Sequence, residues 1–154
     1  MASVEHSPAR VEILVVEDDE GDLLMLEEAL AEPGAPAPPR RVHVARDGEE
    51  ALAFLRRDGA FAHAPAPDLV LLDLNLPKVD GHGVLRAIKA DPALVAIPVV
   101  VLSTSDAEED VWRAYAAHAN AFVTKPASYE ELSAAVRALV HTFTAVATLP
   151  PRPY

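Results

Sequence analysis

The pattern of hydrophobic positions divides the chain into short apolar runs that alternate with longer segments of helical spacing. Short continuous apolar runs are typical of strands buried on both faces of a parallel sheet. The predicted strands cover residues 11–16, 42–45, 68–73, 99–102 and 121–124. Helical spacing follows each of them, as in Leu23, Leu26 and Leu30 after the first strand.

Capping residues mark several of the predicted helix starts. A Ser or Asp followed three residues later by Glu forms a capping box, in which each side chain satisfies a free backbone N–H. This pattern occurs at Asp47 with Glu50, at Ser105 with Glu108 and at Ser128 with Glu131. Gly81 and Gly83 mark a weaker helix start, and the last helix is predicted to continue to about Val146.

The predicted elements form a strand followed by a helix, repeated five times. Strands that alternate with helices imply a parallel sheet with right-handed crossovers, so the fold class is α/β. A length of 154 residues is typical of one domain. We expect an N-terminal tail over residues 1–10, one domain over 10–147 that includes an extended last helix, and a C-terminal tail over 148–154, which should be extended.

Composition narrows the classes of function. The net charge of −11 disfavours nucleic acid as a direct partner, because phosphate binding needs clustered Lys and Arg. The absence of cysteine excludes disulfides and thiol chemistry. No signal peptide and no apolar run long enough for a membrane helix is visible, so we expect a cytoplasmic protein without membrane contacts. The six histidines show no paired metal spacing and are interpreted as surface or packing residues.

Polar residues gather at the carboxyl ends of four predicted strands. These residues are Glu17 and Asp18 after the first strand, Asp73 after the third, Ser103 after the fourth and Lys125 after the fifth. In a parallel sheet these ends lie on one edge, where open α/β sheets bind ligands. Several carboxylates suit Mg²⁺, and a lysine with a hydroxyl can hold phosphate oxygens. The arrangement therefore indicates a phosphoryl group on or near Asp73, since carboxylates can form aspartyl phosphate.

These residues resemble the receiver domain of bacterial two-component response regulators over about residues 10–140. Gly81, eight residues after Asp73, also matches, as do Phe122 at the aromatic switch position and Lys125-Pro126, whose peptide bond is usually cis in the family. More narrowly, the segments 16–22, 44–51 and 74–81 resemble stand-alone receivers that partner bacterial phytochrome histidine kinases. The resemblance implies a flavodoxin-like (βα)5 sheet with strand order 2-1-3-4-5.

The resemblance also implies a mechanism and partners. Asp73 would accept a phosphoryl group from a phosphohistidine of the partner kinase. Magnesium or manganese would be bound by Asp18, Asp73 and the main-chain carbonyl of Asn75, with Glu17 acting through water. Lys125 and Ser103 would contact the phosphoryl oxygens, and Ser103 and Phe122 would then switch the face formed by the fourth helix, fifth strand and fifth helix. We expect a homodimer through that face and the C-terminal extension.

Three positions depart from the family pattern. Thr104 stands where Ala or Gly is usual, so it should restrict access to the phosphate together with Ser105. Ala127 replaces the Phe that often follows Lys-Pro. Gly83 stands where Glu is common, which should weaken the third helix by about 1 kcal/mol relative to Ala.

Two other functions remain open at this point. A haloacid-dehalogenase-type phosphatase also uses an aspartyl phosphate, but it usually places a second Asp where this chain has Asn75. A constitutive interaction module on a receiver scaffold would not need the complete set of site residues. Core packing is the expectation for Trp112 and Tyr115; the alternative is that one of them contacts a partner, since their helix lies on the family's signalling face. The C-terminal tail is either a disordered overhang or part of a dimer interface.

Overall fold

The computed structural model describes residues 10–31 and 39–153. The predicted N-terminal tail lies outside these residues except for Arg10. The strands are β1 (Val11–Val16), β2 (Arg40–Ala45), β3 (Leu69–Leu72), β4 (Val99–Ser103) and β5 (Ala121–Thr124). The helices are α1 (Glu20–Ala31), α2 (Gly48–Arg56), α3 (Gly81–Ala90), α4 (Glu108–Ala116) and α5 (Tyr129–His141).

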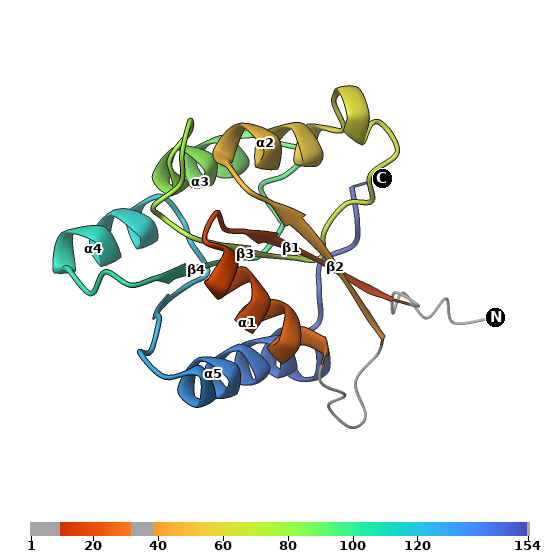
Figure 1. The fold of residues 1–154 in the computed structure, drawn as a ribbon. Helices are drawn as coiled ribbons and strands as arrows, with labels where there is room; N and C mark the ends of the chain where they lie inside the picture. Colours follow the sequence, from red (N-terminus) through yellow and green to blue (C-terminus); the bar gives the residue numbers. More distant parts are fainter. Residues whose placement is uncertain (1–9, 32–38, 154) are drawn as a thin grey trace.

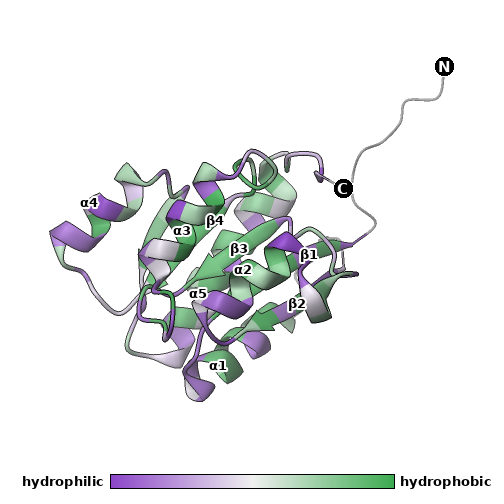
Figure 2. Cartoon of the chain, turned by 90° about the horizontal axis from the view of Figure 1, so that it is seen from above, coloured by the Kyte–Doolittle hydropathy of each residue, from purple (hydrophilic) through white to green (hydrophobic). Residues whose placement is uncertain are grey.

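The five strands form one sheet in the order β2-β1-β3-β4-β5, and every neighbouring pair is parallel. This order confirms the flavodoxin-like, doubly wound parallel sheet that the family resemblance implied. Helices α1 and α5 cover one face, while α2 and α3 cover the other together with α4 at one side (Figure 1). The sheet is the most hydrophobic part of the chain, and hydrophilic residues lie on the outer faces of the helices (Figure 2).

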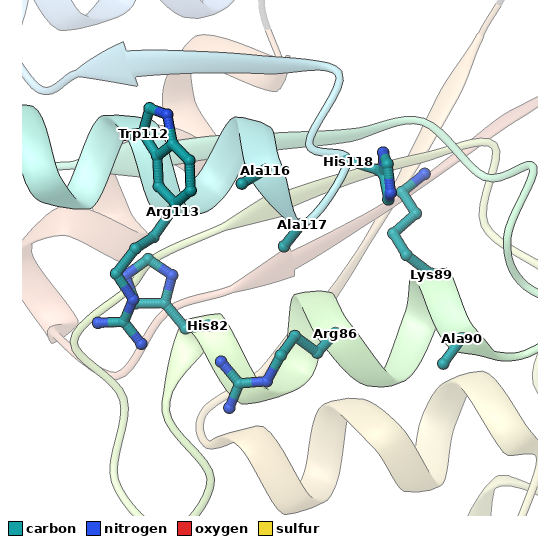
Figure 3. Close-up of a pocket in the computed structure, with 9 residues that line it drawn as sticks. All are labelled: His82, Arg86, Lys89, Ala90, Trp112, Arg113, Ala116, Ala117 and His118. Carbon is teal, nitrogen blue, oxygen red and sulfur yellow. The ribbon is translucent and has the colours of Figure 1, made fainter.

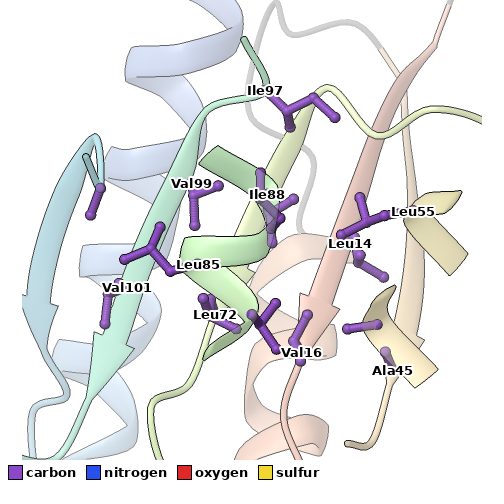
Figure 4. Close-up of a cluster of buried hydrophobic side chains, with 14 of the residues drawn as sticks. Leu14, Val16, Ala45, Leu55, Leu72, Leu85, Ile88, Ile97, Val99 and Val101 are labelled. Carbon is purple, nitrogen blue, oxygen red and sulfur yellow. The ribbon is translucent and has the colours of Figure 1, made fainter. Parts of the chain in front are cut away.

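Alternate residues of each strand point to opposite faces of the sheet and create two separate cores. In β1, Leu14 and Val16 pack on the side of α2 and α3, where the core also includes Leu72, Leu85 and others (Figure 4). Ile13 and Val15 pack on the other side, against buried leucines and valines of α1 and α5. Because both faces are covered, β1, β3 and β4 are fully buried, as their apolar runs predicted.

Four helix starts have side-chain caps that satisfy free backbone N–H groups. At α1, the Asp19 side chain accepts a hydrogen bond from Asp22 N at 2.8 Å. The Asp47 and Ser128 side chains accept hydrogen bonds from the backbone N–H of Glu50 and Glu131, as predicted. Asp80 caps α3 by accepting a hydrogen bond from Gly83 N. The predicted start of this helix rested only on Gly81 and Gly83.

The capping box predicted at Ser105 and Glu108 is wrong. The helix α4 begins at Glu108, Ala107 occupies the cap position, and no side chain caps it. The Ser105 hydroxyl instead donates to Asp110 Oδ2 at 2.6 Å and accepts from Ala107 N at 3.3 Å. Ser105 therefore closes the loop before the helix.

The C-terminal segment packs against the chain's own body. Regular α5 ends at His141, and a π-helical turn over Thr142–Val146 continues it to the predicted end. Phe143 and Leu149 then pack on the α1–α5 core. The Arg152 guanidinium donates to both carboxylate oxygens of Asp68, at 3.0 and 2.7 Å. The alternative of a disordered overhang is therefore wrong for the part of the tail that the structure describes.

Over residues 10–31 and 39–153, no helix combines the length and the apolar composition needed to cross a membrane.

Candidate functional site

The predicted site residues converge at the carboxyl edge of the sheet. Glu17 and Asp18 follow β1, Asp73 follows β3, Ser103 ends β4 and Lys125 follows β5. Backbone hydrogen bonds continue the sheet pairing into this region: Asp73 N donates to Val16 O at 3.0 Å, and Lys125 N donates to Ser103 O at 2.7 Å. The sheet register therefore places these side chains on one edge although they lie far apart in the sequence.

Three carboxylates form a cluster at this edge. One oxygen from each of Glu17, Asp18 and Asp73 lies within 4.8 Å of the other two. Glu17 and Asp73 are buried, whereas Asp18 is exposed. Carboxylates held this close repel one another, and oxygen ligands of this kind suit a hard divalent cation that keeps some of its water.

Lys125 supplies the positive charge of the site. Its buried ammonium lies 2.5 Å from Glu17 Oε2 and 3.9 Å from Asp73 Oδ1. It also lies 3.0 Å from Asp22 Oδ2 in the first turn of α1. Asp22 is a site residue that sequence reasoning missed. A signal was present, because Asp22 stands in the first turn of the helix that directly follows Glu17 and Asp18.

Burial controls the protonation of the site. It raises the pKa of Glu17 from 4.5 to about 7, against the lowering effect of Lys125. It raises the pKa of the Asp73 carboxyl as well, again partly offset by Lys125. Burial alone would lower the pKa of Lys125, but its hydrogen bonds to Glu17 and Asp22 raise the pKa above its ordinary value. Lys125 is therefore held as a cation, and the two buried carboxyls hold protons more tightly than exposed ones.

The segment after Asp73 turns closely around the site. Asn75 N donates to Asp73 Oδ1 at 3.4 Å, and Gly81 N donates to Leu74 O at 2.9 Å. A Cβ atom at position 81 would lie only 2.3 Å from the Asp73 carbonyl oxygen. Glycine is therefore required there for α3 to start so close to the carboxylate.

Ser103 and the loop after β4 form the opposite side of the site. Ser103 is fully buried, and its hydroxyl accepts a hydrogen bond from Ser105 N at 3.1 Å. Thr104 is exposed. A polar cavity of about 450 Å³ lies beside Ser103 and is also lined by Asn75, His82 and residues of the α3 and α4 region. The site is therefore open to a small polar group at this point.

The predicted switch aromatic, Phe122, is half-buried and packs on the core beneath α4. Its backbone N–H donates to the Tyr115 hydroxyl at 3.1 Å, which ties β5 to α4. Tyr115 is 48% exposed and Trp112 is 72% exposed, so the prediction that both pack in the core is wrong. Ala114 is the residue of α4 that is fully buried.

The Lys125–Pro126 bond differs from the expectation that the family resemblance gave. No cis peptide bond occurs within residues 10–31 and 39–153, so this bond is trans.

Comparison with known protein families agrees with this geometry. The family model described as response regulator receiver domain matches residues 13–137. The chain therefore belongs to the response regulator receiver family, as its strand-end residues indicated. It is a response regulator homologous to phytochrome response regulators.

Individual relatives support this assignment. The response regulator Rcp1 of Synechocystis sp. is 40% identical over 148 residues, which cover 96% of this chain and 98% of that protein. The phosphorylated cyanobacterial phytochrome response regulator RcpA has 46% identity and a TM-score of 0.87, over 92% of this chain and 99% of that one. The Mn²⁺-bound form of Rcp1 has 40% identity and a TM-score of 0.85, over 91% and 99% of the two chains.

Proposed function

We propose that this chain is a phosphorylation switch that accepts a phosphoryl group on Asp73 from a partner histidine kinase. The observation that best supports this proposal is the set of charged groups around Asp73. Its buried carboxylate lies 3.9 Å from the Lys125 ammonium and beside two further carboxylates. An aspartate placed in this way has a nearby cation for the phosphoryl oxygens and a set of ligands for a metal ion.

The acidic cluster fits Mg²⁺ or Mn²⁺, because three carboxylates offer oxygens within 4.8 Å of one another. Asp18, Asp73 and the main-chain carbonyl of Asn75 would hold the ion, with Glu17 acting through water. When bound, the ion neutralises negative charge on the phosphoryl oxygens. The Mn²⁺-bound form of Rcp1 supports a metal of this kind.

The chain's own residues account for the transfer. An ionised oxygen of Asp73 attacks phosphorus, the P–N bond of the phosphohistidine breaks, and its electron pair stays on the imidazole nitrogen. Lys125 and the Ser103 hydroxyl contact the phosphoryl oxygens. When the Ser103 hydroxyl turns to the phosphoryl group, it gives up its hydrogen bond from Ser105 N, and Phe122 moves inward. Thr104 and Ser105 border the path by which water reaches the phosphoryl group.

A phytochrome-type kinase is the partner that the relatives favour, since RcpA is a phytochrome response regulator of 46% identity. Phosphotransfer requires both proteins in one compartment, which we take to be the cytoplasm. The strongly acidic charge disfavours output through direct nucleic-acid contacts. Output would instead pass through protein contacts.

We also propose a homodimer through the face formed by α4, β5 and α5 together with the C-terminal extension. β5 is an edge strand of the sheet. Tyr115 on α4, Tyr129 on α5 and Val146 in the extension all expose large apolar side chains. Sedimentation of wild type and Val146→Asp, with and without beryllofluoride, tests this interface. A monomer under all conditions would contradict it.

Phosphorylation itself is tested by mass spectrometry after incubation with acetyl phosphate and Mg²⁺. Wild type should gain one phosphoryl group, and Asp73→Asn should gain none. Asp106→Asn, an exposed carboxylate outside the cluster, is the matched control and should behave like wild type. Lack of any adduct, from acetyl phosphate and from phytochrome kinases alike, would refute the switch. Rapid turnover of small phosphate esters would favour a phosphatase instead.

A further inference from the structure

A groove of about 520 Å³ lies between α3 and α4, and the proposed phosphorylation mechanism does not use it. Its floor is formed by small side chains, Ala90 from α3 together with Ala116 and Ala117 from the end of α4 (Figure 3). Larger side chains stand around this floor. The groove therefore combines a flat apolar surface with a polar rim.

The rim is positively charged although the protein is acidic. Arg86 of α3 and Arg113 of α4 are exposed and face the groove from the two helices (Figure 3). None of the lining residues is a carboxylate, in a chain of net charge −11. Lys89 also borders the groove, but its ammonium donates to the carbonyls of Val95 and Ile97 and to Asn120 Oδ1. Arg86 and Arg113 are therefore the exposed arginines of the rim, and the charge of Arg113 also acts on Asp110.

Trp112 and His82 also line the groove, and the indole of Trp112 is unusually exposed. Trp112 is 72% exposed, which is unusual for an indole unless a partner covers it. His82 is only 6% exposed, and its Nε2 atom lies 3.5 Å from Asp110 Oδ1, at the limit of a hydrogen bond. The other carboxylate oxygen of Asp110, Oδ2, accepts a hydrogen bond from the Ser105 hydroxyl. A ligand in the groove would cover the indole.

We propose that this groove binds an acidic peptide segment of a partner protein. Carboxylates of the segment pair with Arg86 and Arg113, and an apolar side chain between them packs on the alanine floor against Trp112. The arginines stand on opposite helices, which suits charges spread along a chain.

Trp112 makes the test direct, because it is the only tryptophan of the chain. The probe is a short synthetic peptide in which Glu residues flank one central Phe. We expect a saturable shift of the Trp112 emission to shorter wavelength, weakened by salt. Arg86→Glu should weaken binding by about tenfold or more. Arg56→Glu makes the same charge change at an exposed position of α2 and should leave binding unchanged.

Four outcomes would overturn the proposal. The first is no shift at about 1 mM peptide, a concentration at which even weak complexes form. The second is equal binding of a peptide in which Gln replaces Glu. The third is a saturable shift of the Trp112 emission with ATP but not with the peptide, which would assign the groove to a nucleotide. The fourth is self-association abolished by Arg86→Glu, which would assign the groove to a second copy of this chain. None of these outcomes depends on phosphorylation of Asp73.

Discussion

The Lys125 ammonium lies 3.0 Å from the Asp22 carboxylate, closer than its 3.9 Å approach to Asp73. Asp22 therefore competes for a donor that the phosphoryl group on Asp73 would need. Because the Asp22 side chain is 26% exposed, solvent weakens this ion pair without abolishing it. Asp22 thus favours the unphosphorylated arrangement of Lys125.

Replacing Asp22 with Asn should release that donor and strengthen the phosphorylated state. We expect Asp22→Asn to bind beryllofluoride, in the presence of Mg²⁺, about three- to tenfold more tightly than wild type, as measured by calorimetry. Glu27→Gln, an exposed carboxylate further along α1, serves as the control for net charge and should match wild type. Weaker binding by Asp22→Asn would mean that Asp22 instead holds Lys125 in place for the phosphoryl group.

The raised pKa of Glu17 predicts how the stability of the metal-free protein depends on pH. Between pH 4.5 and about 7 the folded protein retains a proton on Glu17 that the unfolded chain has released. Its free energy of unfolding should therefore fall as the pH rises through this window. Asp73, whose pKa is also raised, acts in the same direction.

Urea denaturation in the presence of a chelator measures this effect. Glu17→Gln cannot titrate, so its free energy of unfolding should change less steeply with pH than that of wild type. Added Mg²⁺ should stabilise wild type more at the upper end of the window, because the ion competes with protons for the carboxylates. Identical pH slopes for wild type and Glu17→Gln would contradict the assignment of the raised pKa to Glu17.

The buried strands and most of the site were predictable from sequence because local pattern determines them. An apolar run at Leu69–Leu72 that ends in a carboxylate fixes both the burial of β3 and the position of Asp73. Parallel strands then bring Ser103 and Lys125 to the same edge without any knowledge of packing. The five dispersed residues were sufficient to indicate the family.

Features that depend on side-chain competition were not predictable. The Ser105 hydroxyl could accept a hydrogen bond from Glu108 N, as a helix cap does, or donate one to the Asp110 carboxylate. The path of the loop before α4 places it against Asp110. Trp112 was expected in the core together with Tyr115, three residues further along the helix, yet the buried residue of α4 is Ala114. Pairs of distant residues, such as Arg152 with Asp68, leave no local pattern at all.

The pairing of Arg152 with Asp68 should contribute measurably to stability. Asp68 is 4% exposed, and its carboxylate accepts two hydrogen bonds from Arg152 and one from Glu12 N at 2.8 Å. Arg152→Ala would leave a buried carboxylate partly unpaired, which costs about 1–3 kcal/mol. Urea denaturation at neutral pH measures this loss, and Arg41→Ala at an exposed position of β2 is the control. A loss no larger than that of the control would show that the C-terminal segment is not held by this pair.

Thr104 should control how long the phosphoryl group remains on Asp73. It follows the buried Ser103, at an exposed position on the loop that borders the site. A side chain of this size should hinder the water that hydrolyses the acyl phosphate. We expect Thr104→Ala to shorten the half-life of the phosphorylated protein severalfold. The decay can be followed after removal of acetyl phosphate, by separating the two forms on a phosphate-affinity gel.

The control is Thr124→Ala, which changes another exposed threonine at the end of a strand and should leave the half-life unchanged. An unchanged half-life in Thr104→Ala would remove Thr104 as a barrier to water.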